Sequence, residues 1–144
     1  MKQEPFVIQR VYDAPVEKVW EAITNVQQMK QWYMDKLEDF KPEPGFVTRF
    51  TVNNFGKDFE HIWTVKEAVP NIKISYEWKY GGQPGESMVS FELEAEGKRT
   101  RLTLTHSGLE TFNPAVYPEY ARENFVQGWT SLIGTQLKTF VEQA

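Results

Sequence analysis

The stretch YPEYARENFVQGWTSLIGTQLKTFV, residues Tyr117 to Val141, decides the fold. Its apolar residues recur at steps of three and four, the spacing that gathers side chains on one face of an α-helix. A helix of about 25 residues is about 37 Å long at 1.5 Å per residue, enough to span a small domain. We therefore expect a long amphipathic helix covering an apolar surface built by the preceding residues. The apolar face consists of Phe125, Trp129, Leu132, Ile133, Leu137, Phe140 and Val141.

The segments before this helix alternate apolar and polar residues with a period of two, which is typical of half-buried β-strands. The alternation is clearest where Ile72, Ile74, Tyr76 and Trp78 share one face. In the first strand the inward face stays open, because both members of Phe6/Ile8 and of Val7/Val11 are apolar. The expected strands are residues 6–13, 46–52, 59–69, 72–79, 89–94 and 101–106.

The connections between these strands are short and are marked by Gly, Pro and Asn at 42–45, 53–56, 70–71, 81–85 and 96–98. Parallel neighbours would need crossovers of a dozen residues or more, so the strands pair antiparallel. Two short segments with apolar residues at helical spacing interrupt the strand pattern early in the chain, and we expect each to form a short helix. The first opens at Ala14-Pro15 and includes Val16, Val19, Trp20 and Ile23, and the second includes Val26, Met29 and Trp32-Tyr33.

The sequence therefore predicts an α+β fold: a curved antiparallel sheet of about six to seven strands wrapped on a long C-terminal helix, with two short helices after the first strand. We expect one domain over residues 1–144, since this length buries roughly two-thirds of its unfolded surface. Five Trp residues in such a chain indicate a bulky aromatic core.

Composition excludes several classes of function. The net charge is −4 and there is no run of Lys or Arg, whereas nucleic-acid binding needs a basic patch. The absence of cysteine excludes disulfides, thiolate nucleophiles and Cys-ligated metals. No stretch resembles a signal peptide or approaches 18 apolar residues, so we expect a cytoplasmic protein without a membrane span.

This order of elements resembles the helix-grip (START-like, SRPBCC) fold of the major birch pollen allergen, steroidogenic-acute-regulatory-related lipid-transfer domains and polyketide cyclases. The closer resemblance is to the branch named for the activator of the heat-shock protein 90 ATPase, homologue 1, and it covers nearly the whole chain. The residues that carry it are Ala14-Pro15, Val19-Trp20, Trp32, Thr64–Pro70, Ile74–Trp78, Val89–Leu93, Thr100–His106, Gly108 and Gly128-Trp129. The resemblance implies a cavity between sheet and helix and a link to the stress response. The co-chaperone that gives the branch its name has two domains, and the resemblance is to its C-terminal domain. We find no counterpart of its N-terminal domain in this sequence.

The alternation along the strands and the three- and four-residue spacing in the helix place seven candidate ligand-binding residues between the sheet and the helix. A mostly apolar pocket with a few polar groups is typical of a small-molecule site. Each residue also has a plainer interpretation, because buried histidines usually bond a carbonyl and aromatic rings fill close-packed cores. The seven are His61, Trp63, Tyr76, Trp78, His106, Phe125 and Trp129.

The sequence carries no HExxH motif, carboxylate–histidine cluster, nucleophile elbow, phosphate-binding loop or dinucleotide fingerprint, so we expect no metal, no cofactor and no assigned catalytic residue. The first hypothesis is a non-catalytic binding module for a small hydrophobic or amphipathic ligand. The second is a co-chaperone-like regulator that binds a protein partner. The third is a cyclase- or hydrolase-like enzyme that uses Tyr76 and His106 for acid–base chemistry. We expect a monomer or weak dimer.

Overall fold

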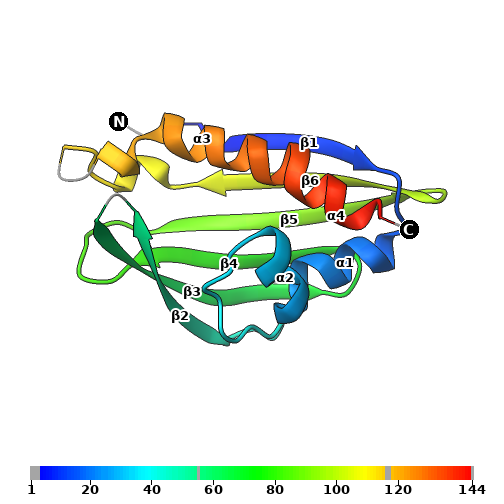
Figure 1. Cartoon of the computed structure of the whole chain (residues 1–144), viewed down its shortest axis with the longest axis horizontal. Helices are drawn as coiled ribbons and strands as arrows, with labels where there is room; N and C mark the ends of the chain where they lie inside the picture. Colours follow the sequence, from blue (N-terminus) through cyan, green and yellow to red (C-terminus); the bar gives the residue numbers. More distant parts are fainter. Residues whose placement is uncertain (1–3, 55, 116–117, 144) are drawn as a thin grey trace.

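A six-stranded antiparallel sheet with the order β1-β6-β5-β4-β3-β2 forms the body of the protein. The computed structural model describes residues 4–54, 56–115 and 118–143. The first strand pairs with the last, and the long C-terminal helix crosses the inner face of the sheet (Figure 1). The predicted helix-grip architecture is confirmed. The strands are β1 (Phe6–Tyr12), β2 (Val47–Asn54), β3 (Lys57–Val69), β4 (Lys73–Tyr80), β5 (Ser87–Glu96) and β6 (Arg99–Ser107).

The two short helices predicted after the first strand are α1 (Val16–Thr24) and α2 (Val26–Trp32). Asn25 separates them, and its side chain accepts a hydrogen bond from the Gln28 N–H, which is the usual chemistry of a helix start. The Trp32 indole donates to the Ala22 carbonyl at 2.7 Å, so the second helix is fixed against the first. Helix α1 also packs against the end of the C-terminal helix and against β5 and β6.

The C-terminal helical segment begins later than the sequence predicted. Pro118–Tyr120 form a 3₁₀ turn (η2), Ala121 is extended, and the helix then runs from Arg122 to Val141. The predicted start at Tyr117 lies outside the described residues, as does Phe55 in the predicted turn at 53–56. A second 3₁₀ turn, η1 (Leu109–Thr111), follows β6.

The helix changes its winding midway. It consists of α3 (Arg122–Ser131), a π-helical segment η3 (Leu132–Gln136) and α4 (Leu137–Val141). In η3 the Leu137 N–H bonds the Leu132 carbonyl five residues earlier. The wider turn presents the Ile133 carbonyl to β1, where the buried Tyr12 hydroxyl donates to it at 2.6 Å. This bond joins the edge strand to the middle of the helix, and the alternation pattern alone gave no sign of it.

The inner faces of the strands agree with the predicted alternation except at Ile72. Tyr76 and Trp78 are buried, and in β1 Ile8 is buried while Val7 is exposed, which settles the open question there. The placement of Ile72 on the inner face was wrong, because this residue precedes β4 and is 57% exposed. Its N–H closes the turn after Val69 by bonding the Val69 carbonyl.

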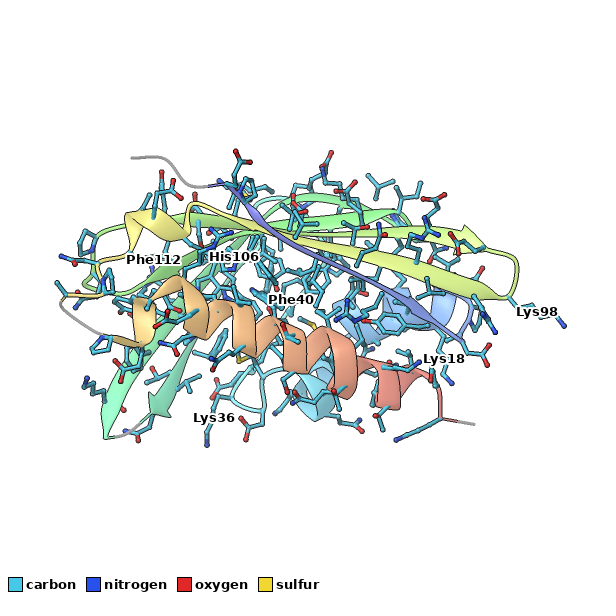
Figure 2. The ribbon with its side chains drawn as sticks, turned by 90° about the horizontal axis from the view of Figure 1, so that it is seen from above. Lys18, Lys36, Phe40, Lys98, His106 and Phe112 are labelled. Carbon is cyan, nitrogen blue, oxygen red and sulfur yellow. The ribbon has the colours of Figure 1, made fainter. Side chains whose placement is uncertain are left out.

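Side chains fill the space between sheet and C-terminal helix. His106 and Phe40 lie in this interior, whereas Lys36 and Lys98 project outward (Figure 2). None of the described helices is long and apolar enough to cross a membrane.

We expect Tyr12→Phe to lower the free energy of unfolding by about 1–3 kcal/mol, because it leaves the buried Ile133 carbonyl without its donor. The measurement is urea unfolding followed by circular dichroism. Gln9→Ala, an exposed change on the same strand, should stay within about 0.5 kcal/mol. A loss no larger in Tyr12→Phe than in this control would show that the bond contributes little.

Candidate functional site

The seven predicted site residues come together in one aromatic layer between the sheet and α3. Six are buried, and Phe125 is half-buried. Trp78 is central: its ring centroid lies 5.4 Å from that of His61, 5.3 Å from that of His106 and 5.9 Å from that of Trp129. The rings touch one another directly, so much of the expected ligand space is filled by side chains.

His106 sits in a chain of hydrogen bonds that crosses three strands. The Trp129 indole N–H, from α3, donates to His106 Nδ1 at 3.0 Å. His106 Nε2 lies 2.8 Å from the Ser87 hydroxyl oxygen, and that hydroxyl donates to the Trp78 carbonyl at 2.8 Å. Since Nδ1 accepts, the neutral ring carries its proton on Nε2 and donates it to Ser87.

This direction of bonding decides what His106 can do chemically. A general base for Ser87 would need a free lone pair on Nε2, but that nitrogen already carries the hydrogen. Burial lowers the pKa of His106 to about 3, so the ring is neutral at neutral pH. The Ser87–His106 pair therefore acts as a buried structural contact, although its distance resembles that of a nucleophile and its base.

Tyr76 is also fully engaged. Its hydroxyl lies 2.6 Å from the Tyr33 hydroxyl in the buried interior. Burial raises the pKa of both tyrosines above the ordinary value. The ring of Tyr33 stacks on Trp63 with a centroid distance of 5.3 Å, so the pair is part of the packed layer.

An open cavity of about 690 Å³ lies at one end of this layer, bordered by the ends of β2, β3 and β4 and by the start of α3. His61 and Phe125 line it, whereas the other five predicted residues do not. Ligand contact by the seven residues stays a prediction. The lining consists of Met34, Val52, Phe59, His61, Tyr80, Pro118, Glu119, Tyr120, Asn124, Phe125, Gln127 and Gly128.

The sequence pattern did not lead us to most of this lining, although two of its residues could have been predicted. Phe59 precedes His61 by two residues and Tyr80 follows Trp78 by two, so the same alternation extended outward would have included both. Met34 follows α2 and Tyr120 belongs to η2, irregular parts of the chain in which no periodicity indicates direction.

His61 brings a polar group to the cavity from a fixed position. Its Nδ1 lies 3.0 Å from the Phe59 carbonyl oxygen. Its ring stacks on Phe50 with centroids 4.8 Å apart and meets the edge of Tyr80 at 4.9 Å. Burial lowers the pKa of His61 to about 4, so this ring is neutral as well.

Two further polar residues of the cavity, Asn124 and Glu119, lie on its α3 side. The Asn124 side-chain N–H₂ donates to the Pro118 carbonyl at 2.8 Å. The Glu119 carboxylate is 3.4 Å from Lys57 Nζ. No group of three or more His, Asp or Glu side chains that could hold a metal ion occurs in the part of the chain described.

Comparison with known proteins agrees with this fold. The family model described as Activator of Hsp90 ATPase homolog 1-like protein matches residues 13–142. None of the curated proteins compared with the chain matches it. Many solved structures do.

Three solved structures illustrate the similarity. Protein CV1439 from Chromobacterium violaceum has a TM-score of 0.79 at 22% identity, covering 97% of this chain and 98% of its own. Protein BH1534 from Bacillus halodurans has a TM-score of 0.74 at 27% identity, with coverage of 98% and 99%. DynU16, a protein of the dynemicin biosynthetic locus, has a TM-score of 0.74 at 23% identity; 98% of this chain covers 48% of DynU16.

Both histidines should make the protein labile to acid. Their pKa values lie below the ordinary 6.5, so below that pH the unfolded chain binds protons that the folded chain excludes. Stability is then fully present above pH 6.5 and is lost as the pH falls toward 4. We expect each histidine to contribute about 2–3 kcal/mol of this loss at pH 4.5.

The measurement is urea unfolding of wild type, His61→Phe and His106→Gln between pH 7.5 and 4.5. Each variant should show a shallower slope of unfolding free energy against pH, by up to about 1.4 kcal/mol per pH unit for one proton. Slopes equal to that of wild type would contradict the assignment of neutral buried rings.

Trp129→Ala should cost about 3–5 kcal/mol of unfolding free energy, because it deletes a buried aromatic ring and removes the donor to His106. Glu77→Ala, on the outer face of β4, should stay within about 0.5 kcal/mol. Chemical denaturation of both variants provides the comparison. A change below 1 kcal/mol in Trp129→Ala would be inconsistent with its position in the core.

Proposed function

The chain belongs to the Activator of Hsp90 ATPase homolog 1-like family, and from this membership and the geometry of the cavity we propose that it is a non-catalytic binding module. It holds a small hydrophobic or amphipathic ligand between the sheet and the start of the C-terminal helix. The ligand enters at the end where β2, β3 and α3 border the opening.

The observation that carries this proposal is the open cavity itself. Its volume of about 690 Å³ falls within the range of roughly 300–1,000 Å³ that is common for small-molecule sites. Aromatic and aliphatic side chains dominate the lining, with His61 and Asn124 among the few polar groups. This combination favours burial of an apolar body with a small number of directed hydrogen bonds.

The catalytic alternative receives less support from the same geometry. His106 donates from Nε2 and Tyr76 is bonded to Tyr33, and neither residue lines the cavity. An acid–base enzyme needs its titrating groups within reach of the bound substrate. A binding role asks only for shape, apolar surface and a few polar contacts.

The protein-partner alternative draws on the name of the family. A regulator that acts through its outer surface would leave the cavity without an occupant. Ligand binding therefore separates the two roles directly.

Gly128 offers a way to close the cavity without damaging the fold. It lies within α3 and lines the cavity, and a Cβ built on it meets no atom within 4 Å. A glycine inside a helix costs about 0.5–1 kcal/mol relative to alanine, so replacing it should not destabilise the protein. We expect Gly128→Leu to weaken binding of the uncharged fluorescent probe N-phenyl-1-naphthylamine at least about tenfold, equivalent to about 1.4 kcal/mol.

Two controls accompany this variant. Gly128→Ala adds only a methyl group and should retain most of the binding, and Thr130→Leu adds the same apolar side chain at an exposed position of the same helix. Thermal unfolding of all three confirms that they fold. Failure of the wild type to bind the probe, or equal binding by Gly128→Leu, would refute the proposal in favour of the protein-partner role.

A further inference from the structure

Building on the proposed function, we infer that the ligand is an uncharged aromatic molecule that donates a hydrogen bond, from a hydroxyl or N–H group, to Nε2 of His61. His61 then sets the specificity of the cavity.

The hydrogen bond at Nδ1 determines what the other ring nitrogen does. The Phe59 carbonyl can only accept, so the Nδ1 atom 3.0 Å from it carries the hydrogen. In the neutral ring Nε2 is then a bare acceptor. His61 is neutral at neutral pH because burial disfavours its charged form.

The position of Nε2 makes it available to a ligand. No residue in the described part of the chain forms a hydrogen bond with it. It is also not among the fully enclosed side-chain atoms that lack a partner, and His61 lines the cavity, so the cavity is the space from which Nε2 is reached. Stacking on Phe50 holds the ring in this orientation.

Two of the remaining polar residues of the lining, Glu119 and Asn124, favour a hydrogen-bond donor over an anion. Glu119 brings a carboxylate to the lining, and Lys57 Nζ lies 3.4 Å from it. The Asn124 side chain uses its N–H₂ group on Pro118, which leaves its carbonyl oxygen as a further acceptor. A deprotonated carboxylate has no hydrogen to give to His61.

The walls of the cavity favour a flat ring. Phe59, Tyr80 and Tyr120 form a connected aromatic wall, with centroid distances of 6.2 Å, 5.7 Å and 4.7 Å between their pairs. Phe125 contributes another ring from α3. Aromatic pairs add about 0.5–1.5 kcal/mol beyond the area they bury, so an aromatic ligand gains more here than an alkyl chain of equal size.

Three naphthalene derivatives of similar size test this inference by isothermal titration calorimetry at pH 7.5. 2-Naphthol has a donor, 2-methoxynaphthalene replaces it with an ether, and 2-naphthoate is an anion. We expect 2-naphthol to bind about fivefold more tightly than the ether, the effect of one hydrogen bond, and 2-naphthoate to bind most weakly.

The variant His61→Phe keeps a ring to stack on Phe50 and removes the acceptor, so the preference for 2-naphthol over the ether should disappear. The control Glu60→Gln, exposed and next to it on β3, should retain the preference. If His61→Phe does not fold, the series on the wild type decides alone.

The outcomes separate the two proposals. Equal binding of 2-naphthol and the ether, tightest binding of 2-naphthoate, or an unchanged preference in His61→Phe overturns the inference and leaves the binding module intact. Binding of none of the three compounds, together with no binding of N-phenyl-1-naphthylamine, overturns both.

Discussion

The hydrogen bond from the Trp129 indole to His106 Nδ1 fixes the C-terminal helix to β6, the strand beside the edge strand β1. It continues through Ser87 to the Trp78 carbonyl, so one buried chain of bonds connects α3 with β6, β5 and β4. Inside a dry core each such bond is strong, and losing one partner leaves the next group unpaired. Tyr12 makes a second connection, from β1 to the π-helical segment. Together the two contacts set the position of the helix along the sheet.

The aromatic layer around this chain of bonds affects where a ligand cavity can lie. Trp63, Tyr76 and Trp78 fill the middle of the concave face, and the cavity of about 690 Å³ lies toward the β2–β3 end. Packing these bulky rings costs free energy, because the Trp63 and Trp78 indole N–H groups are buried without an acceptor among the described residues. The same rings that stabilise the core therefore displace the candidate binding site from the centre of the fold to its edge.

Periodicity was sufficient to predict the sheet, the two short helices and the buried face of the long helix, because each buried set repeats with the period of its element. It could not indicate the π-helical turn at Leu132–Gln136, since Ile133 and Leu137 keep their four-residue spacing through it. It also placed both histidines inward without indicating which one borders open space. That difference depends on neighbours from other elements of the fold: Trp129 of α3 for His106 and Phe50 of β2 for His61.

The two histidines show that residue type alone does not determine chemical role. Both are buried and neutral, yet Nδ1 accepts a hydrogen bond in His106 and donates one in His61. The partner decides: an indole N–H can only donate, and a backbone carbonyl can only accept. In His106 the remaining hydrogen goes to Ser87, so the ring has no free site. In His61 the remaining group is a lone pair at the cavity. The proposed contact with a ligand therefore falls to the histidine whose partner is a carbonyl.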